Sequence, residues 1–187
     1  MHAIKNVVSK SIVLNKDVMI KQLDSSHTEA LFSLTEANRS YLKKWLPWVD
    51  LCISQSDTLD FITIANEALC NNSRLVFGIF FKEKIAGMIS FNTIDLSNGT
   101  AEIGYWIGEA FQGLGLVTLA CAKLVDIGFK QLGLQDIAIK CATHNTKSQN
   151  IPMRLGFKKG EHVLKNENVH GMYMDLIEYT IQRDQYL

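Results

Sequence analysis

The sequence has no excess of charge of either sign, because its 19 lysines and arginines balance its 19 aspartates and glutamates. Proteins that bind nucleic acid or an acidic membrane surface usually carry an excess or a patch of positive charge. The composition therefore gives no reason to expect a nucleic-acid partner or a membrane partner. It favours specific recognition of a ligand by a surface without strong net charge.

The sequence also lacks long hydrophobic runs and closely spaced cysteines. No apolar run in the N-terminal segment is longer than residues 12–14, which is too short for a signal peptide or a membrane span. The four cysteines have no Cys-x-x-Cys pair and no histidine at metal spacing, so we expect neither a metal site nor a disulfide framework. They are Cys52, Cys70, Cys121 and Cys141. Free thiols are typical of a reducing compartment, and we expect a cytoplasmic protein.

Linker-like segments are also missing, since the chain has only two prolines and no stretch of low complexity. We find no internal repeat. A chain of 187 residues is long enough to bury one proper hydrophobic core. We therefore expect a single domain over residues 1–187.

The stretch at residues 101–132 has the clearest pattern in the chain. Residues 101–107 alternate as a strand does, which predicts two faces. One face carries Ile103, Tyr105 and Ile107, and the other carries Glu102, Gly104 and Trp106. From residue 116 to residue 132 apolar residues recur at helical spacing, and so wide a stripe suits a helix lying on a sheet. Its first row is Leu116, Leu119, Ala120, Leu124 and Ile127, and a second row is Val117, Cys121, Val125 and Phe129.

Two glycines, Gly113 and Gly115, stand where this helix begins. The first amides of a helix have no partner within it, and glycine lets a ligand approach the main chain, so this junction can hold a phosphate or pyrophosphate. A plain tight turn between strand and helix explains the glycines equally well. A P-loop would need Lys-Ser/Thr where Leu116-Val117 follows, and a dinucleotide fingerprint would need glycine in place of Thr118.

Shorter patterns predict the remaining elements. We expect a hairpin-like first strand within residues 11–23, strands at 75–81, 85–94 and 137–141, and two final strands at 157–164 and 172–183 joined by a polar stretch at 165–170. Helices should begin at a cap within residues 24–26, cover residues 41–46 before Pro47, begin at Ser56 or Asp57, and begin at Asn145. Pro152 should bend or break the last helix, because it removes a backbone hydrogen bond. Strands near both ends with helices between them indicate an α/β or α+β domain built on a mixed sheet.

Three segments together resemble a known family. Gln112-x-x-Gly115-x-Val117 looks like the acetyl-coenzyme A signature of the GNAT superfamily, from which it departs only at Val117. The segment at residues 145–157, NTKSQNIPMRLGF, and the segment Trp45-Leu-Pro-Trp48 follow the pattern of the ribosomal-protein serine/alanine N-acetyltransferase branch. This resemblance covers essentially the whole chain.

The resemblance implies a fold and a set of binding residues. The fold would be a single, mostly antiparallel sheet of about seven strands, flanked by helices, whose fourth and fifth strands splay apart to admit the pantetheine arm of acetyl-CoA. No metal is implied, a homodimer is plausible, and Trp45 and Trp48 would form a wall of the acceptor pocket, although two tryptophans at a helix end are more often core anchors. Coenzyme contacts would come from Tyr105, Trp106, Ile107, Gln112, Gly113, Leu114, Gly115, Leu116, Val117, Thr118, Asn145 and Ser148, the first three through their main chain.

Acetyl transfer to an amine needs positioning, a base for the amine proton and stabilisation of the leaving thiolate. The resemblance implies that Ser148 donates a proton to the sulfur, because Pro152 stands where most of the superfamily has a tyrosine. From spacing alone, Asn145 is a helix cap and Ser148 a cap or a surface hydroxyl.

The base is a choice among several residues. Glu102 lies nearest the slot in sequence, but an ordinary salt-bridged glutamate fits it as well. In the resembling branch a glutamate after Gly-Phe and before glycine is a candidate base, but here the order is Gly160-Glu161, which puts Glu161 in doubt. A histidine can accept a proton at neutral pH, and His144 is the third candidate, although a single loop histidine is more often solvated.

The sequence thus predicts transfer of an acetyl group from acetyl-CoA to a primary amine by direct attack in a ternary complex. By resemblance the acceptor is the N-terminal amine of a protein that begins with serine or alanine. Alternatives are a small amine, such as a polyamine or an antibiotic, or a catalytically silent acyl-CoA sensor, which the departures at Val117, Pro152 and Glu161 would allow. We do not expect nucleotide-dependent phosphoryl transfer, because the glycine loop lacks the lysine that a P-loop needs.

Overall fold

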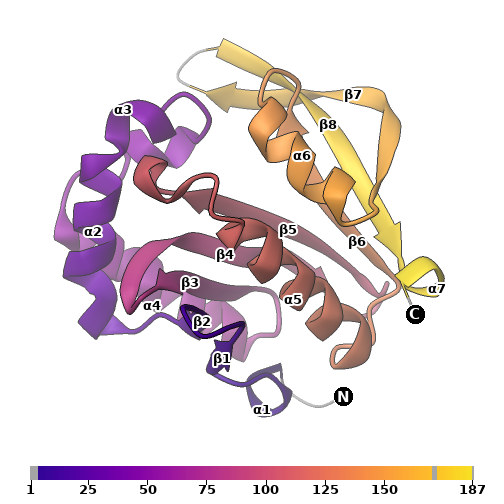
Figure 1. The fold of residues 1–187 in the computed structure, drawn as a ribbon, viewed down its shortest axis with the longest axis horizontal. Helices are drawn as coiled ribbons and strands as arrows, with labels where there is room; N and C mark the ends of the chain where they lie inside the picture. The colour runs from indigo at the N-terminus through magenta and orange to yellow at the C-terminus, as the bar shows by residue number, and fades with distance from the viewer. Residues whose placement is uncertain (1–3, 170–171, 187) are drawn as a thin grey trace.

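The computed structural model describes residues 4–169 and 172–186. One eight-stranded sheet runs through it in the order β1-β2-β3-β4-β5-β6-β8-β7, with helices on both faces (Figure 1). The strands are β1 Ser11–Val13, β2 Val18–Gln22, β3 Leu75–Phe81, β4 Lys84–Asp95, β5 Thr100–Ile107, β6 Asp136–Ala142, β7 Lys158–Val169 and β8 Met172–Gln182. The helices are α1 Ile4–Val7, α2 Thr28–Ala37, α3 Arg39–Leu42, α4 Gln55–Cys70, α5 Leu116–Lys130, α6 Thr146–Arg154 and α7 Arg183–Tyr186. Short 3-10 helices cover Ser25–His27, Pro47–Asp50 and Glu109–Phe111.

The predicted fold class is confirmed, because β5 and β6 are the one parallel pair in a sheet of otherwise antiparallel neighbours. The strand count differs from the expected seven. Residues 11–22 form two strands rather than one, since the side chain of Asn15 accepts a hydrogen bond from the Asp17 amide (2.9 Å) and closes a turn between them. Because this hairpin counts as two strands, the splayed pair that was expected to be the fourth and fifth strands is numbered as the fifth and sixth.

The splay itself lies between β5 and β6. The two strands pair only from Thr100 opposite Asp136 to Ile103 opposite Ile139. Beyond this point Gly104–Ile107 of β5 has no β6 partner, while β6 continues along β8 as far as Ala142. Figure 1 shows β5 and β6 separating, with α5 in front of one half of the sheet and α6 in front of the other.

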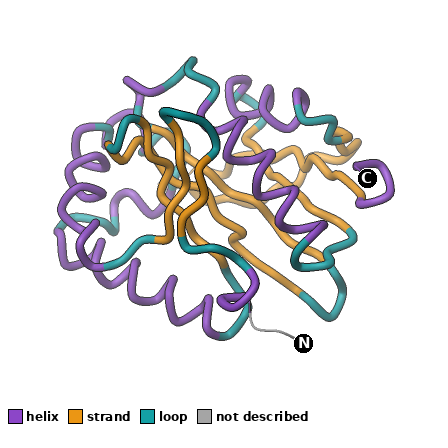
Figure 2. The backbone as a smooth tube through the Cα atoms, turned by 60° about the horizontal axis from the view of Figure 1, so that its bottom comes forward, coloured by secondary structure: helices purple, strands orange, loops and turns teal. Residues whose placement is uncertain are grey.

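Two hydrophobic clusters hold helices against opposite faces of the sheet. The larger one joins α5 and α1 to the face of Phe77, Ile89 and Ile103. The smaller one places α2 and α4 on the other face, against Val76 and Met88. β3 is buried on both faces, which explains its unbroken apolar sequence. Figure 2 shows the helices enclosing the strands from both sides.

Several predicted boundaries need correction. Ser54, not Ser56 or Asp57, caps α4, and Asp57 completes a capping box by accepting from the Ser54 amide. The helix expected at residues 41–46 is the shorter α3 at Arg39–Leu42, and Pro47 begins a 3-10 helix, because a proline lacks only an amide that would be unpaired there. Leu119 is 40% exposed on the outer face of α5 rather than in its buried stripe.

The C-terminal strands also differ from expectation. β7 runs on to Val169 through most of the polar stretch expected to connect the two final strands, because β8 pairs with it over this length. The end of that stretch, at residue 170, lies outside the described residues. α6 continues through Pro152 to Arg154 and stops before Gly156, whose φ is +80°.

Candidate acetyl-transfer site

A cavity of about 1800 Å³ passes through the break between β5 and β6. It is lined by the loop before α5, the unpaired end of β5, the start of α6 and the segment that joins α3 to α4. The structure brings together all the predicted site residues at this cavity except Leu114 and the candidate bases Glu161 and His144. Residues that are far apart in the sequence therefore share one continuous space.

The glycine loop forms an open cradle at the start of α5. Gly113 and Gly115 have φ of +76° and +73°, and a β-carbon at either position would meet no atom within 4 Å. The first amide bonded within the helix is that of Leu119, which donates to the Gly115 carbonyl (3.0 Å). The preceding amides are thus available at a helix N-terminus, where partial positive charge favours an anion. This geometry fits the phosphates of a coenzyme.

Gln112 adds polar groups to this cradle. Its Oε1 accepts a hydrogen bond from Lys147 Nζ (2.9 Å), which brings a positive charge from α6 to the loop. Its Nε2 is buried next to the Tyr41 hydroxyl and has no hydrogen bond of good geometry within the described chain. A buried donor without a partner is costly, so this amide also points to a ligand. The sequence signature identified Gln112, but gave no sign of Lys147.

Pro152 explains an unexpected contact between α6 and β5. Proline has no amide hydrogen, so the carbonyl of Ser148, four residues earlier, lacks its helical donor. The Tyr105 hydroxyl supplies the missing hydrogen bond and donates to that carbonyl (2.9 Å). α6 continues through Pro152, so the break that was one of the two expected outcomes does not occur. Tyr105, for which only a main-chain role was predicted, also acts through its side chain.

The Ser148 hydroxyl belongs to the same cluster. It donates to the Tyr105 hydroxyl (3.3 Å) and lies 3.3 Å from Cys141 Sγ. Burial raises the pKa of Tyr105 strongly, and the neighbouring Cys141 adds to this shift. Burial likewise raises the pKa of Cys141. Both groups are neutral at physiological pH, so this side of the cavity offers proton donors rather than a base.

The loop between β6 and α6 is fixed by side chains that the sequence did not single out. Asn145 is the N-cap of α6 and accepts from the Ser148 amide (3.1 Å), as its spacing predicts. Gln149 Nε2 donates to the carbonyls of Ala142 and Thr143 (both 2.9 Å), and Tyr179 donates to Gln149 Oε1 (3.0 Å). These bonds hold Ser148 at the wall of the cavity. No local sequence pattern predicts this role of Gln149, because its hydrogen-bond partners lie outside α6.

Aromatic residues line the opposite side of the cavity. Trp48 lies 5.9 Å from Trp106 between ring centroids, and both rings, with Trp45, border the space. All three are half-buried, so they are neither pure core anchors nor fully exposed. A hydrogen bond joins α2 to the segment before the glycine loop. Asn38, at the end of α2, accepts it from the amide of Glu109 (2.8 Å).

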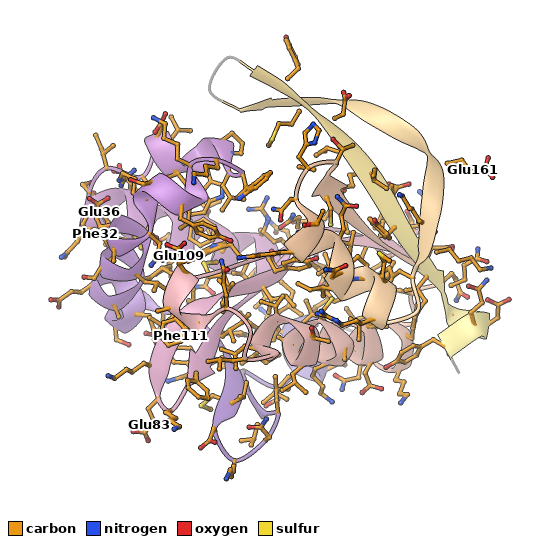
Figure 3. All side chains as sticks on the ribbon, turned by 45° about the horizontal axis from the view of Figure 1, so that its top comes forward. Phe32, Glu36, Glu83, Glu109, Phe111 and Glu161 are labelled. Carbon is orange, nitrogen blue, oxygen red and sulfur yellow. The ribbon has the colours of Figure 1, made fainter. Side chains whose placement is uncertain are left out.

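The three candidate bases lie in different surroundings. Glu102 lines the cavity on the face of Trp106 and forms an ion pair with Lys140 on β6 (2.6 Å). This ion pair is the ordinary salt bridge that was the alternative to a catalytic role for Glu102. Glu161 is exposed on β7 and points away from the cavity (Figure 3). His144 is exposed and does not line the cavity.

Residues 17–158 match the family model described as an acetyltransferase (GNAT) domain. The chain belongs to the GNAT acetyltransferase family. The predicted resemblance and the prediction that the chain is an acetyltransferase are thereby confirmed. Within the described residues the structure has no group of side chains suited to hold a metal ion. No described helix is long and apolar enough to cross a membrane, and all four cysteines are free.

Relatives of this GNAT protein include ribosomal-protein acetyltransferases. YdaF of Bacillus subtilis (strain 168), which is named a putative ribosomal N-acetyltransferase, is 32% identical over 92% of this chain and 95% of its own. The ribosomal-protein-serine acetyltransferase of Escherichia coli (strain K12) is 29% identical over 80% of this chain and 84% of its own.

Two solved structures carry ligands. RimL, a ribosomal L7/L12 α-N-protein acetyltransferase in complex with coenzyme A, superimposes with a TM-score of 0.89 at 28% identity and covers 94% of this chain and 99% of its own. The microcin C7 self-immunity acetyltransferase MccE, in complex with acetyl-CoA and AMP, has a TM-score of 0.88 at 34% identity over 94% of this chain and 98% of its own.

Proposed function

We propose that the protein transfers an acetyl group from acetyl-CoA to the N-terminal amine of a protein that begins with serine or alanine. The observation that carries this proposal is the break between β5 and β6, which joins the glycine cradle to an aromatic-walled space in one cavity. Support for the cosubstrate comes from the coenzyme complexes of RimL and MccE. Support for the acceptor comes from the ribosomal-protein acetyltransferases among the relatives.

The glycine loop and α6 hold the coenzyme in this proposal. Amides of residues 113–118 and the side chains of Gln112 and Lys147 bind its phosphates, and the unpaired main chain of Tyr105–Ile107 binds the pantetheine arm. An unpaired strand edge offers alternating donors and acceptors that match the amides of pantetheine. Asn145 and Ser148 complete the binding site from α6.

The acetyl group moves in one direct attack. The amine nitrogen forms a bond to the thioester carbonyl carbon, the carbon–sulfur bond breaks, and the amine loses one proton. We assign that proton to Glu102, because Glu102 lines the cavity and Glu161 does not. Ser148, whose hydroxyl lies with Tyr105 at the coenzyme side, gives a proton to the departing sulfur and regains one from solvent.

The test is to incubate the protein with labelled acetyl-CoA and peptides that begin with serine, alanine or another residue, and to identify the products by mass spectrometry. We expect acetylation of the α-amine of the serine and alanine peptides. Coenzyme binding by calorimetry with no turnover on any amine would instead identify a silent acyl-CoA sensor. Failure to bind any acyl-CoA would overturn the proposal.

A second acceptor is favoured by the three tryptophans. Trp45, Trp48 and Trp106 offer flat apolar surfaces suited to stacking on a planar ring, and MccE, at 34% identity, was solved with AMP. A small amine attached to a nucleotide is therefore the alternative substrate. Preference for such an amine over the peptides in the same assay would select it.

The expected assembly and location stay proposals. A homodimer is tested by light scattering of the purified protein at several concentrations. A cytoplasmic location, for which the four free thiols are the support, is tested by fractionation of cells that express the protein.

A further inference from the structure

Asn92 occupies an irregular position on β4 at the floor of the cavity. Phe91 pairs with Ile103 and Thr93 pairs with Glu102, so Asn92 is the extra residue of a β-bulge. Bulges often redirect a side chain beside an active site. Asn92 belongs to none of the predicted coenzyme or acceptor contacts.

Two hydrogen bonds fix this residue. The Ser90 hydroxyl donates to Asn92 Oδ1 (2.6 Å), and Arg74 Nε donates to the Asn92 carbonyl (3.1 Å). The first bond orients the side-chain amide with its oxygen toward Ser90 and its nitrogen away from it. The second holds the backbone at the bulge. The Asn92 amide is therefore placed before any ligand arrives.

Gly104 makes room for this amide. A β-carbon at position 104 would lie 2.3 Å from Asn92 Nδ2 and 2.9 Å from its Cγ. Glycine weakens the interior of a strand, and often marks a place where another group approaches the backbone closely. Here that group is the Asn92 amide, which lies over the first residue of β5 beyond its last pair with β6.

The amide nitrogen is an unused donor on a residue that lines the cavity. Ser90, Asn92 and Gly104 all line the cavity, and Asn92 Nδ2 donates to no atom within residues 4–169 and 172–186. Gly104 shares its face of β5 with Glu102 and Trp106, and this face lies on the acceptor side of the sheet. A rigid donor at this point can bind an acceptor atom of the substrate at little entropic cost.

We propose that Asn92 Nδ2 binds the carbonyl oxygen next to the reacting amine, so that the protein recognises its substrate as an α-amino acyl group. This inference rests on the proposed function and narrows its substrate class. The reacting nitrogen must keep its lone pair for the thioester, so it is not the partner of this donor. In a peptide N-terminus the first carbonyl is the nearest backbone acceptor to that nitrogen, whereas a polyamine has none.

The experiment compares two acceptors and two proteins. One acceptor is a seryl peptide, and the other is the same peptide with its first peptide bond replaced by an (E)-alkene, which lacks the carbonyl. For the wild-type protein we expect the alkene to lower kcat/KM about tenfold, the value of one hydrogen bond of about 1.4 kcal/mol. For Asn92→Ala we expect the peptide to react about tenfold more slowly and the two acceptors to differ by less than about twofold, because the partner of the carbonyl is gone.

Controls separate this role from folding. Coenzyme affinity by calorimetry should not change in Asn92→Ala, and Asn71→Ala, at an exposed asparagine outside the cavity, should behave as wild type. Ser90→Ala frees the Asn92 amide and should raise KM for the peptide but not for the alkene. Asn92→Asp replaces the donor with an acceptor and should resemble Asn92→Ala.

Two results would overturn the inference. If Asn92→Ala slowed both acceptors equally, Asn92 would act on the thioester or on the fold instead. If Asn92→Asp had the same kcat/KM values as the wild-type protein, the side-chain atom of residue 92 that contacts the substrate would be a hydrogen-bond acceptor and not the donor Nδ2. Absence of turnover by the wild-type protein on both acceptors and on the serine and alanine peptides would instead reject the proposed function.

Discussion

The two faces of β5 build the two halves of the cavity in different ways. On the coenzyme half, backbone features dominate: positive φ at two glycines, a helix N-terminus and an unpaired strand edge. On the acceptor half, side chains dominate, and they come from separate elements. They include Trp48 before α4, Asn92 on β4, Trp106 on β5 and Lys140 on β6.

This difference has a physical consequence. A backbone cradle binds whatever carries the right phosphates, and it tolerates few substitutions because the main-chain conformation is the binding group. An acceptor wall made of side chains can change its chemistry one residue at a time while the sheet stays the same. Substitutions in the glycine cradle should therefore lower coenzyme binding, whereas those on the acceptor half should lower turnover or change selectivity.

The largest expected effect is on coenzyme binding by Gly115→Val. A β-branched residue at φ of +73° costs about 1–3 kcal/mol in backbone strain, and its side chain fills the open space of the cradle. We expect affinity for coenzyme A to fall at least about a hundredfold, measured by calorimetry. Gly133→Val is the matched control, because Gly133 has φ of +71°, similar open space, and no place in the cavity. Equal loss of affinity in both variants would contradict the cradle.

The next effect is on turnover and concerns the two candidate glutamate bases, Glu102 inside the cavity and Glu161 outside it. We expect Glu102→Gln to lower kcat about a hundredfold, the low end for loss of a general base, with coenzyme affinity unchanged. The rate should recover as rising pH deprotonates the amine without help. Glu161→Gln serves as the control and should keep the wild-type rate. If both variants react as wild type at neutral pH, the amine loses its proton to water and the assignment to Glu102 is wrong.

Ser148→Ala should have a smaller effect on the coenzyme half. A thiol is fairly acidic, about pKa 8.5 for cysteine, so its thiolate leaves without assistance at a reduced rate. We expect kcat to fall about ten- to a hundredfold, measured in single-turnover experiments. Thr146→Ala, at an exposed hydroxyl two residues earlier in α6, should leave kcat unchanged. An unchanged kcat in Ser148→Ala would remove the serine from catalysis.

The smallest effect concerns stability at the contact between β5 and α6. Tyr105→Phe removes the donor to the Ser148 carbonyl (2.9 Å), and leaving that buried group unpaired should cost about 1–3 kcal/mol in free energy of unfolding. Pro152→Ala restores the helical amide, so the cost of Tyr105→Phe should shrink when both changes are present. Urea unfolding of the four proteins measures this coupling. Strictly additive costs would show that Tyr105 does not substitute for the amide that proline lacks.

Much of the fold followed from local patterns. The alternation of residues 101–107 and the helical stripe after residue 116 correspond to β5 and α5, and β3 has the expected bounds. Some predicted helix boundaries were wrong, because more than one residue could cap a helix and because a proline can either end one helix or begin another. Ser54 caps α4 in place of Ser56 or Asp57, and Pro47, which was expected only to end the helix before it, begins a 3-10 helix. Local sequence offers several caps, and packing selects among them.

The sequence by itself determined the glycine loop and the cap of α6, because Gly113, Gly115 and Asn145 act through their own backbone or through neighbours a few residues away. Only the tertiary structure decided the roles of Tyr105, Gln149, Lys147 and Asn92. Each of these side chains meets its partner across a sheet or between a helix and a strand, as Tyr105 meets Ser148 and Asn92 meets Gly104. Helical and strand periodicities specify which face a residue occupies, but they carry no information about which distant residue will face it there. That pairing is set when β5 and β6 pair over only part of their length and the chain packs around the gap.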